Sequence, residues 1–244
     1  MDAGSRTVKV AVLEDGCLVE TRIADTGVNP LQTARQLLGG LDGTRLVATG
    51  YSRHLLREHL GCSVVTEIRA HALGVGYLFP NCHTVVDVGG QDSKVIRIAE
   101  GGVADFQMND RCAAGTGRFL EVMASALRYE LSKFARVATE TRESVAISSM
   151  CTVFAESEVI GLVARGEERA RIARGLHESV VTRLVGMVGR VGVEPEVVFT
   201  GGVALNCCMV ELLGNALHMS VRVPPDPQIT GALGAALECA RILS

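Results

Sequence analysis

The sequence contains no tryptophan, and aromatic residues make up only 4% of its 244 residues. Binding of single-stranded nucleic acid depends on aromatic stacking and on clustered positive charge. The chain has a net charge of −3 at pH 7, so its composition favours neither. We therefore expect no nucleic acid partner.

The chain also lacks a hydrophobic run of the roughly 18 residues that a membrane-spanning helix needs. Its first residues include Asp2, Lys9 and Glu14, where a secretory signal would be apolar. Its eight cysteines are spread along a chain too long for a small disulfide-stapled secreted domain. These features predict a protein of the reducing cytoplasm that does not associate with membranes.

Short runs of β-branched residues alternate with helical patterns, which is typical of an α/β fold. Two strand pairs, each joined by a glycine turn, are predicted at 7–13 with 18–23 and at 93–98 with 103–107. The spacing of apolar residues and the helix-start signals predict helices that begin at Pro30 and cover 118–127, 152–160 and 167–191.

One sequence pattern occurs twice, and the second copy begins 85 residues after the first. The first copy consists of Asp2, Gly4, Lys9, Val10 and Gly16, and the second of Asp87, Gly89, Lys94, Val95 and Gly101. Segments 47–50 and 198–201 form a second echo, each an apolar strand that ends in Thr-Gly. The repetition predicts a duplicated protein whose two similar lobes face each other across a cleft.

The repeated turn has the chemistry of a phosphate site. Glycine lets backbone N–H groups approach phosphate oxygens, while Ser5 and Thr7 add hydroxyl donors and Lys9 adds a charge. Asp2 and Asp87 would hold Mg²⁺ through its waters. The alternative is that each Asp-Gly pair is only a structural turn. Because the P-loop pattern G-x4-G-K-[ST] is absent, the chain is not predicted to be a P-loop protein.

Two cysteines stand out because each precedes a predicted helix. Cys112 and Cys151 lie at or near helix starts, where the positive end of the helix dipole stabilises an anionic cluster. A four-iron cluster needs four ligands, and one chain supplies only two of them. A two-fold dimer would supply all four. A role in packing is the alternative for any single thiol. We interpret the other six as core or loop residues: Cys17, Cys62, Cys82, Cys207, Cys208 and Cys239.

Four longer segments carry more specific motifs: 86–94 (VDVGGQDSK), 106–120 (FQMNDRCAAGTGRFL), 151–160 (CTVFAESEVI) and 200–204 (TGGVA). Together they closely resemble the activator ATPases of 2-hydroxyacyl-CoA dehydratases, a family that includes the ATP-binding subunits of benzoyl-CoA reductase. The resemblance implies two ribonuclease H-like lobes of the actin, sugar kinase and heat-shock chaperone type, with ATP and Mg²⁺ in the cleft. It also implies a homodimer that shares one [4Fe-4S] cluster, bound by Cys112 and Cys151.

The same resemblance implies roles for individual residues. Asp2 and Asp87 belong to the catalytic centre, and Gln91 would orient a water molecule on the terminal phosphate. Glu156 and Glu158 either face the nucleotide or only solvate a helix. The residues implied to bind the nucleotide are Gly4, Ser5, Thr7, Lys9, Gly89, Gly90, Lys94, Gly201, Gly202 and Asn206.

The activity that the resemblance implies is ATP hydrolysis coupled to low-potential one-electron transfer. A reduced ferredoxin or flavodoxin would donate the electron, and a 2-hydroxyacyl-CoA dehydratase would accept it. Three alternatives are an ATP-binding subunit of a benzoyl-CoA reductase, a small-molecule kinase with Asp110 as base, and a non-enzymatic nucleotide switch. The last two leave the cysteine-centred segments unexplained.

The first lobe departs from the family pattern, because Met1 stands directly before Asp2, where relatives have an apolar strand. We expect a first lobe at 1–80 that lacks an inner strand and a second lobe at 81–244 that carries the cluster-binding helices. A start codon assigned too late would explain the departure.

Overall fold

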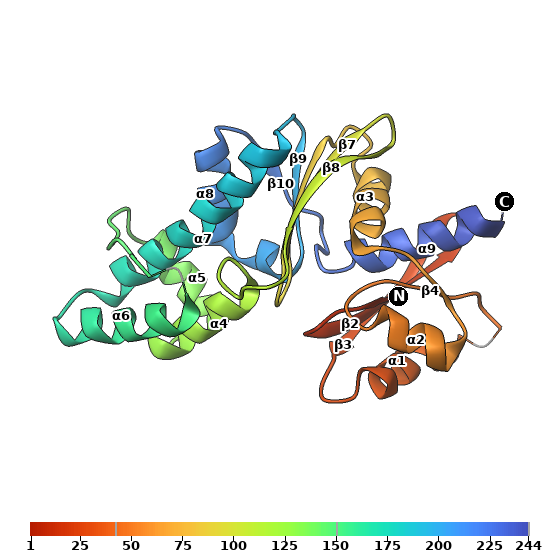
Figure 1. Ribbon diagram of the computed structural model, residues 1–244, viewed down its shortest axis with the longest axis horizontal. Coiled ribbons are helices and arrows are strands. Elements are labelled where there is room, and N and C mark those ends of the chain that lie inside the picture. Colours follow the sequence, from red (N-terminus) through yellow and green to blue (C-terminus); the bar gives the residue numbers. More distant parts are fainter. Residues whose placement is uncertain (42, 150, 244) are drawn as a thin grey trace.

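The computed structural model describes residues 1–41, 43–149 and 151–243 as a mixed α/β protein with two lobes (Figure 1). The first lobe contains β1 (Asp2–Ala3), β2 (Thr7–Glu14), β3 (Cys17–Asp25), α1 (Pro30–Leu38), β4 (Val47–Ala48), α2 (Arg53–Leu60) and β5 (Ser63–Val64), followed by the connecting helix α3 (Glu67–Leu78). The second contains β6 (Thr84–Val88), β7 (Ser93–Ala99), β8 (Gly102–Asn109), α4 (Gly117–Ala126), α5 (Leu131–Thr139), α6 (Thr152–Ala164), α7 (Arg169–Val191), β9 (Val197–Thr200), the 3-10 helix η1 (Gly202–Leu205), α8 (Cys207–Leu217) and β10 (Val221–Arg222), followed by α9 (Thr230–Leu243).

Local sequence accounts for many of these bounds. The side chain of Asn29 caps α1 by accepting a hydrogen bond from the backbone of Gln32, and Pro30 occupies the first helical position. Asp15 and Gly16 both adopt positive φ, which the tight turn of β2–β3 requires. Both predicted hairpins, β2–β3 and β7–β8, are confirmed, and so is the long helix α7.

The two lobes repeat one topology. In the first lobe β1, β2 and β3 form an antiparallel sheet, and β4 pairs with β5 in parallel. The second lobe joins the same two parts into one sheet of order β10-β9-β6-β7-β8. The register is also repeated, because Asp2 pairs with Lys9 as Asp87 pairs with Lys94. This shared register confirms the predicted duplication.

The two connecting helices are exchanged between the lobes. Val75 of α3 packs against Val85 and Ile96 on the sheet of the second lobe, whereas Ala232 and Leu233 of α9 pack against the first lobe. In Figure 1, α3 lies beside the strands of the second lobe, and α9 meets it and then runs outward over the first lobe to the C-terminus. From the sequence we expected a single lobe boundary at residue 80. Each helix buries its apolar face on the sheet of the other lobe, so residues on both sides of that boundary pack together.

The helices approach closely where they cross. A Cβ at Gly74 would collide with the carbonyl oxygen of Thr230, and a Cβ at Gly234 would collide with that of Ala70. Only glycine therefore allows this backbone approach. The sequence repeats Ala-Leu-Gly at 72–74 and 232–234, which marks the crossing in both helices.

The two-residue strand β1 lies at the inner position of the first lobe, where we expected a strand to be lacking. A parallel bridge from Asp2 to Thr49 joins it to the end of β4. The ammonium of Met1 donates a hydrogen bond of 2.9 Å to the carbonyl oxygen of Val47. Burial lowers the pKa of this amino group to about 6.

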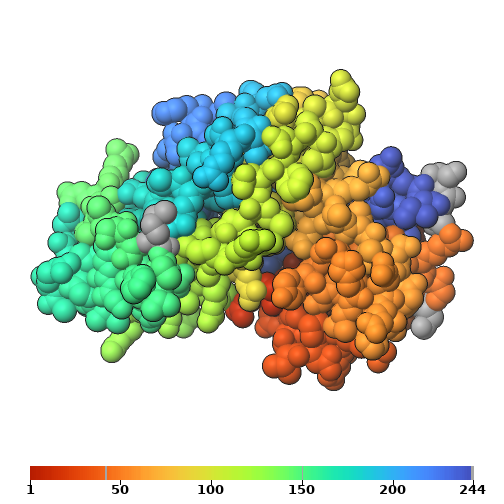
Figure 2. Space-filling view, viewed as in Figure 1, coloured from red at the N-terminus to blue at the C-terminus, as the bar shows by residue number. Residues whose placement is uncertain are grey.

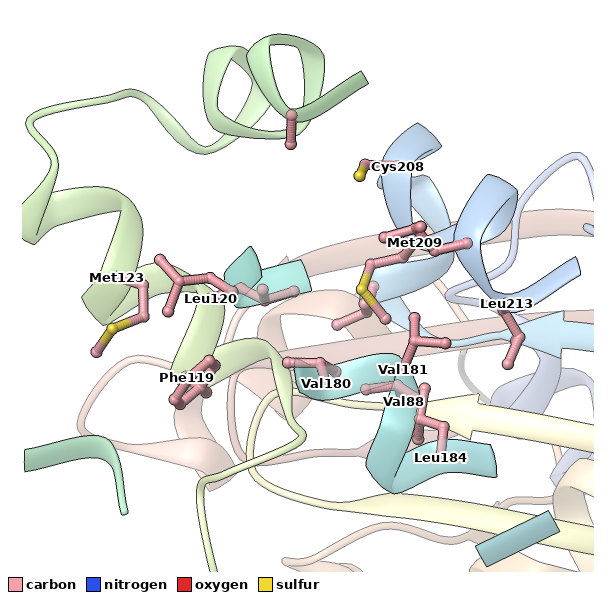
Figure 3. Close-up of a cluster of buried hydrophobic side chains, with 14 of the residues drawn as sticks. Val88, Phe119, Leu120, Met123, Val180, Val181, Leu184, Cys208, Met209 and Leu213 are labelled. Carbon is pink, nitrogen blue, oxygen red and sulfur yellow. The ribbon is translucent and has the colours of Figure 1, made fainter. Parts of the chain in front are cut away.

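The largest hydrophobic core lies in the second lobe, where α4, α7 and α8 meet the sheet. Phe119 and Leu120 of α4 face Val180 and Leu184 of α7, with Met209 of α8 beside them (Figure 3). This core fixes α4, which starts beside the cleft described below. None of the helices formed by the described residues is long and apolar enough to cross a membrane.

Candidate functional site

A cleft of about 930 Å³ lies between the two lobes. Figure 2 shows the surface where the red and orange first lobe meets the yellow-green part of the second. All the residues predicted to hold nucleotide and Mg²⁺ line it: Asp2, Gly4, Ser5, Thr7, Lys9, Asp87, Gly89, Gly90, Gln91, Lys94, Gly201, Gly202 and Asn206. Asp110 lines it as well. Folding thus brings both copies of the repeated turn to one cavity.

The first turn is held by its own backbone and by Thr26. The amide of Gly4 donates to the carbonyl oxygen of Thr7 at 3.1 Å, and the hydroxyl of Thr26 donates to the carbonyl oxygen of Gly4 at 2.8 Å. At its base Lys9 Nζ lies 2.9 Å from Asp2 Oδ2. Burial alone would raise the pKa of Asp2, but nearby positive charge, above all Lys9, lowers it.

The second turn repeats this geometry with more negative charge. The amide of Gly89 donates to the carbonyl oxygen of Asp92 at 2.9 Å. Lys94 Nζ lies 3.2 Å from Asp87, 2.7 Å from Asp92 and 2.9 Å from Glu67 on α3. We expected Lys94 to face a phosphate, but its side chain is buried and bound by three carboxylates. The two lysines of the duplicated turns therefore have different surroundings.

The pKa values of the two carboxylates of the second turn, Asp87 and Asp92, are shifted in opposite directions. Burial opposes ionisation of Asp87, but His71, Lys94 and a hydrogen bond from Thr200 together lower its pKa to about 2. Burial raises the pKa of Asp92. Two ionised, buried carboxylates, Asp2 and Asp87, thus face the cleft from the two lobes. Such a pair fits Mg²⁺, which takes one or two carboxylates and keeps most of its waters.

The loop after β9 also lines the cleft, beside the second turn. Gly201 has a φ of +84°, and a Cβ there would collide with the carbonyl oxygen of Val88. Asn206, which the resemblance implied to bind the nucleotide, uses its side-chain oxygen to cap α8 by accepting from Met209 N at 3.1 Å. Its amide nitrogen lies 2.9 Å from Nε2 of His177. The Asn206 side chain is therefore engaged within the protein.

Several cleft residues were not predicted from the sequence. Glu67 and His71 lie one turn apart on α3, and His71 Nδ1 lies 3.5 Å from Asp87 Oδ1. In the Ala-Leu-Gly repeat His71 corresponds to Gly231, where a Cβ would lie 3.2 Å from His71 Nε2. That repeat is the one sequence signal that would have indicated this helix crossing. Arg6 and Glu121 also line the cleft.

The two candidate cluster ligands are both exposed. Cys151 is the N-cap residue of α6, as predicted. Cys112 lies in the loop between β8 and α4, because the N-cap of α4 is Thr116. Asn109 holds this loop with its side-chain amide, which donates to the carbonyl oxygen of Cys112 at 3.0 Å.

Glu158 has a structural role that neither alternative for it anticipated. Its carboxylate accepts hydrogen bonds from the backbone amides of Ser148 and Ser149, at 2.9 and 2.8 Å, in the segment before α6. Glu156 is exposed, and neither glutamate lines the cleft. Of the other six cysteines, interpreted as core or loop residues, Cys17 and Cys207 are exposed, and Cys207 also lines the cleft.

Known proteins match this chain over nearly its whole length. The solved structure of (R)-2-hydroxyglutaryl-CoA dehydratase component A from Acidaminococcus fermentans is 41% identical, with a TM-score of 0.90 over 97% of this chain and 95% of that one. The activator of 2-hydroxyisocaproyl-CoA dehydratase from Clostridium difficile, solved with bound ADPNP, is 38% identical, with a TM-score of 0.87 over 97% and 91%.

The wider fold is shared with sugar kinases. A ROK family glucokinase from Streptomyces griseus is only 13% identical, yet it superposes with a TM-score of 0.59 over 97% of both chains. This likeness confirms the expected fold of the actin, sugar kinase and heat-shock chaperone type. The sequence model of one family matches residues 1–239. The chain belongs to the BadF/BadG/BcrA/BcrD ATPase family.

Proposed function

We propose that this protein is an ATP-dependent activator that hydrolyses ATP to drive one-electron transfer to a 2-hydroxyacyl-CoA dehydratase. One observation carries the proposal: the helix after the Cys112 loop begins on the second phosphate turn. The amides of Gly117 and Arg118 donate to the carbonyl oxygens of Gly89 and Gly90, at 2.9 and 2.8 Å. A movement of that turn on nucleotide binding would therefore move α4 and the loop before it.

ATP and Mg²⁺ would occupy the cleft between the duplicated turns. Ser5 and Thr7 of the first turn are partly exposed in the cleft and would offer hydroxyl donors to phosphate oxygens, and Asp2 and Asp87 suit the hydrated cation. The likeness to an activator solved with ADPNP supports this nucleotide. Gln91 is exposed in the cleft, where it would orient the hydrolytic water.

Cys112 and Cys151 would bind one [4Fe-4S] cluster together with the same residues of a second copy. Both thiols are exposed, so two from each of two chains would supply the four cysteines that a [4Fe-4S] cluster needs. The exposed apolar side chains of α6, including Val153 and Phe154, would lie against the second copy. The cluster would supply one-electron transfer at low potential.

A reduced ferredoxin or flavodoxin would donate the electron, and the protein would work in the cytoplasm. A role as ATP-binding subunit of a benzoyl-CoA reductase is less well supported, because the two similar structures of about 40% identity both come from 2-hydroxyacyl-CoA dehydratase systems. A kinase would leave the two exposed thiols without a role.

Anaerobic purification of three cysteine variants tests the cluster assignment. We expect Cys112→Ala and Cys151→Ala to lose the iron and the brown colour and to become monomeric, while nucleotide binding persists. Cys17→Ala is the matched control, because Cys17 is also exposed but starts β3 in the first lobe. Full iron content in the Cys151→Ala protein would contradict the assignment.

A second experiment tests the coupling. The reduced protein is mixed with a 2-hydroxyacyl-CoA dehydratase and either ATP or a non-hydrolysable analogue. We expect dehydratase activity only with ATP and with both cysteines intact. Phosphorylation of a small-molecule acceptor without iron would instead indicate a kinase.

A further inference from the structure

Arg6 stands in the middle of the first phosphate turn, and neither the repeated motif nor the proposed activity gives it a role. Its Nη2 lies 3.0 Å from Glu121 Oε1 on α4. The turn belongs to the first lobe and α4 to the second, so this ion pair spans the cleft. The Arg6 side chain is 54% exposed and that of Glu121 is 24% exposed.

The path of the Arg6 side chain brings it onto the second phosphate turn. A Cβ at Gly90 would collide with Cγ of Arg6, so the methylene groups of Arg6 lie directly on the Gly90 backbone. At this position only glycine leaves room for them. Arg6 therefore lies between the two turns that line the cleft, where a terminal phosphate would be bound.

The backbone at both ends of this contact is fixed, whereas the ion pair itself is weak. The carbonyl oxygen of Arg6 accepts from Thr26 N at 2.9 Å, and that of Gly90 accepts from Arg118 N at 2.8 Å. A half-exposed ion pair contributes little free energy, so Arg6 and Glu121 separate readily. A phosphate with two negative charges would offer the guanidinium a stronger, bidentate partner.

We infer that Arg6 senses the terminal phosphate: without nucleotide its guanidinium pairs with Glu121, and the γ-phosphate of a bound nucleoside triphosphate replaces Glu121 as its partner. Glu121 is then the competing anion, and its release changes how α4 is held to the first lobe. The inference rests on the nucleotide site of the proposed function and needs neither the cluster nor the dehydratase.

Nucleotide affinities of Arg6→Gln, Glu121→Gln and the double variant test this exchange. We expect Arg6→Gln to weaken binding of Mg²⁺-ADPNP about tenfold or more, as loss of a charged hydrogen-bond partner does, with a much smaller effect on Mg²⁺-ADP. Glu121→Gln should strengthen Mg²⁺-ADPNP binding about two- to fivefold, because a surface ion pair no longer competes. In the Arg6→Gln background the Glu121 substitution should have no effect on either nucleotide.

The matched control is Arg222→Gln. Arg222 forms a 2.7 Å ion pair with Glu196, the side-chain exposures are 56% and 28%, and neither residue lines the cleft. We expect wild-type affinities for this variant. Unchanged or weaker ADPNP binding by Glu121→Gln, or an equal loss of both nucleotides in Arg6→Gln, would overturn the inference. A wild-type protein that binds nucleotide but no iron would refute the proposed electron transfer and leave the role of Arg6 intact.

Discussion

Lys94 and Glu67 form a 2.9 Å ion pair at the base of the cleft, where α3 begins. The pair joins β7 of the second lobe to the first residue of the connecting helix. Lys9, the counterpart of Lys94 in the first turn, has one carboxylate partner, Asp2. The two copies of the turn have thus diverged. The lysine of the first turn is more accessible, whereas the lysine of the second turn is buried among three acidic side chains.

Replacing Lys94 by methionine should destabilise the protein strongly. The change leaves Asp87, Asp92 and Glu67 without their shared cation, and breaking a buried pair costs about 3–5 kcal/mol. Urea denaturation measures the loss. Lys9→Met is the control and should cost less, about 1–3 kcal/mol, because it leaves one carboxylate unpaired. A larger loss of stability in Lys9→Met than in Lys94→Met would show that the ion pairs of Lys94 with three acids are not the stronger contribution to folding.

His177 should make the protein less stable below neutral pH. Burial lowers its pKa to about 4 from an ordinary value of 6.5, and the neutral ring fits between Ala173 and Asn206. Between these two values the unfolded chain binds a proton that the folded chain does not, so stability falls as pH falls. We expect a loss of about 2 kcal/mol from pH 7 to pH 5 from this group.

Denaturation at pH 7 and pH 5 of the wild type and of His177→Asn measures this contribution. The variant should be less stable at pH 7 but show a smaller loss on acidification. His59→Gln, which removes an exposed histidine of α2, is the control and should keep the wild-type pH dependence. An equal pH dependence in His177→Asn would refute the assignment.

Gly234→Ala should destabilise the crossing of α3 and α9. The new methyl group would collide with the carbonyl oxygen of Ala70, so the helices would have to separate, at a cost of about 1–3 kcal/mol. Gly189→Ala in α7 is the matched control, because no atom lies within 4 Å of its added Cβ. There the higher helix propensity of alanine should stabilise the protein by about 0.5–1 kcal/mol. Thermal unfolding measures both changes: the Tm of Gly234→Ala should fall, and the Tm of Gly189→Ala should rise.

Glu158→Ala should loosen the segment before Cys151. It removes the carboxylate that accepts from the amides of Ser148 and Ser149, and those amides should exchange with solvent faster. Hydrogen exchange measured by mass spectrometry reports the change. Glu156→Ala, in the same helix but exposed, should leave the exchange of this segment unaltered. Equal exchange in both variants would contradict a role for Glu158 in holding the segment.

The sequence alone determined those features that depend on neighbouring residues. The glycine turns, the hairpins on either side of them, the Asn29 cap of α1 and the N-cap position of Cys151 follow from short-range backbone preferences. The repeat of Asp-x-Gly and Lys also predicted the duplication, because each copy keeps the same register. Motif resemblance then indicated the family that the comparisons confirmed.

The tertiary structure decided which residues meet across the cleft. Glu67 reaches Lys94, Arg6 reaches Glu121, and His71 reaches Asp87 only because α3, α4 and the two turns converge there. Helical or strand periodicity shows which face of an element is apolar but not which element covers it. The Ala-Leu-Gly repeat marks where α3 and α9 cross, but the sequence did not show which lobe each helix packs against, nor that Lys94 is buried. Both depend on contacts between segments far apart in the chain.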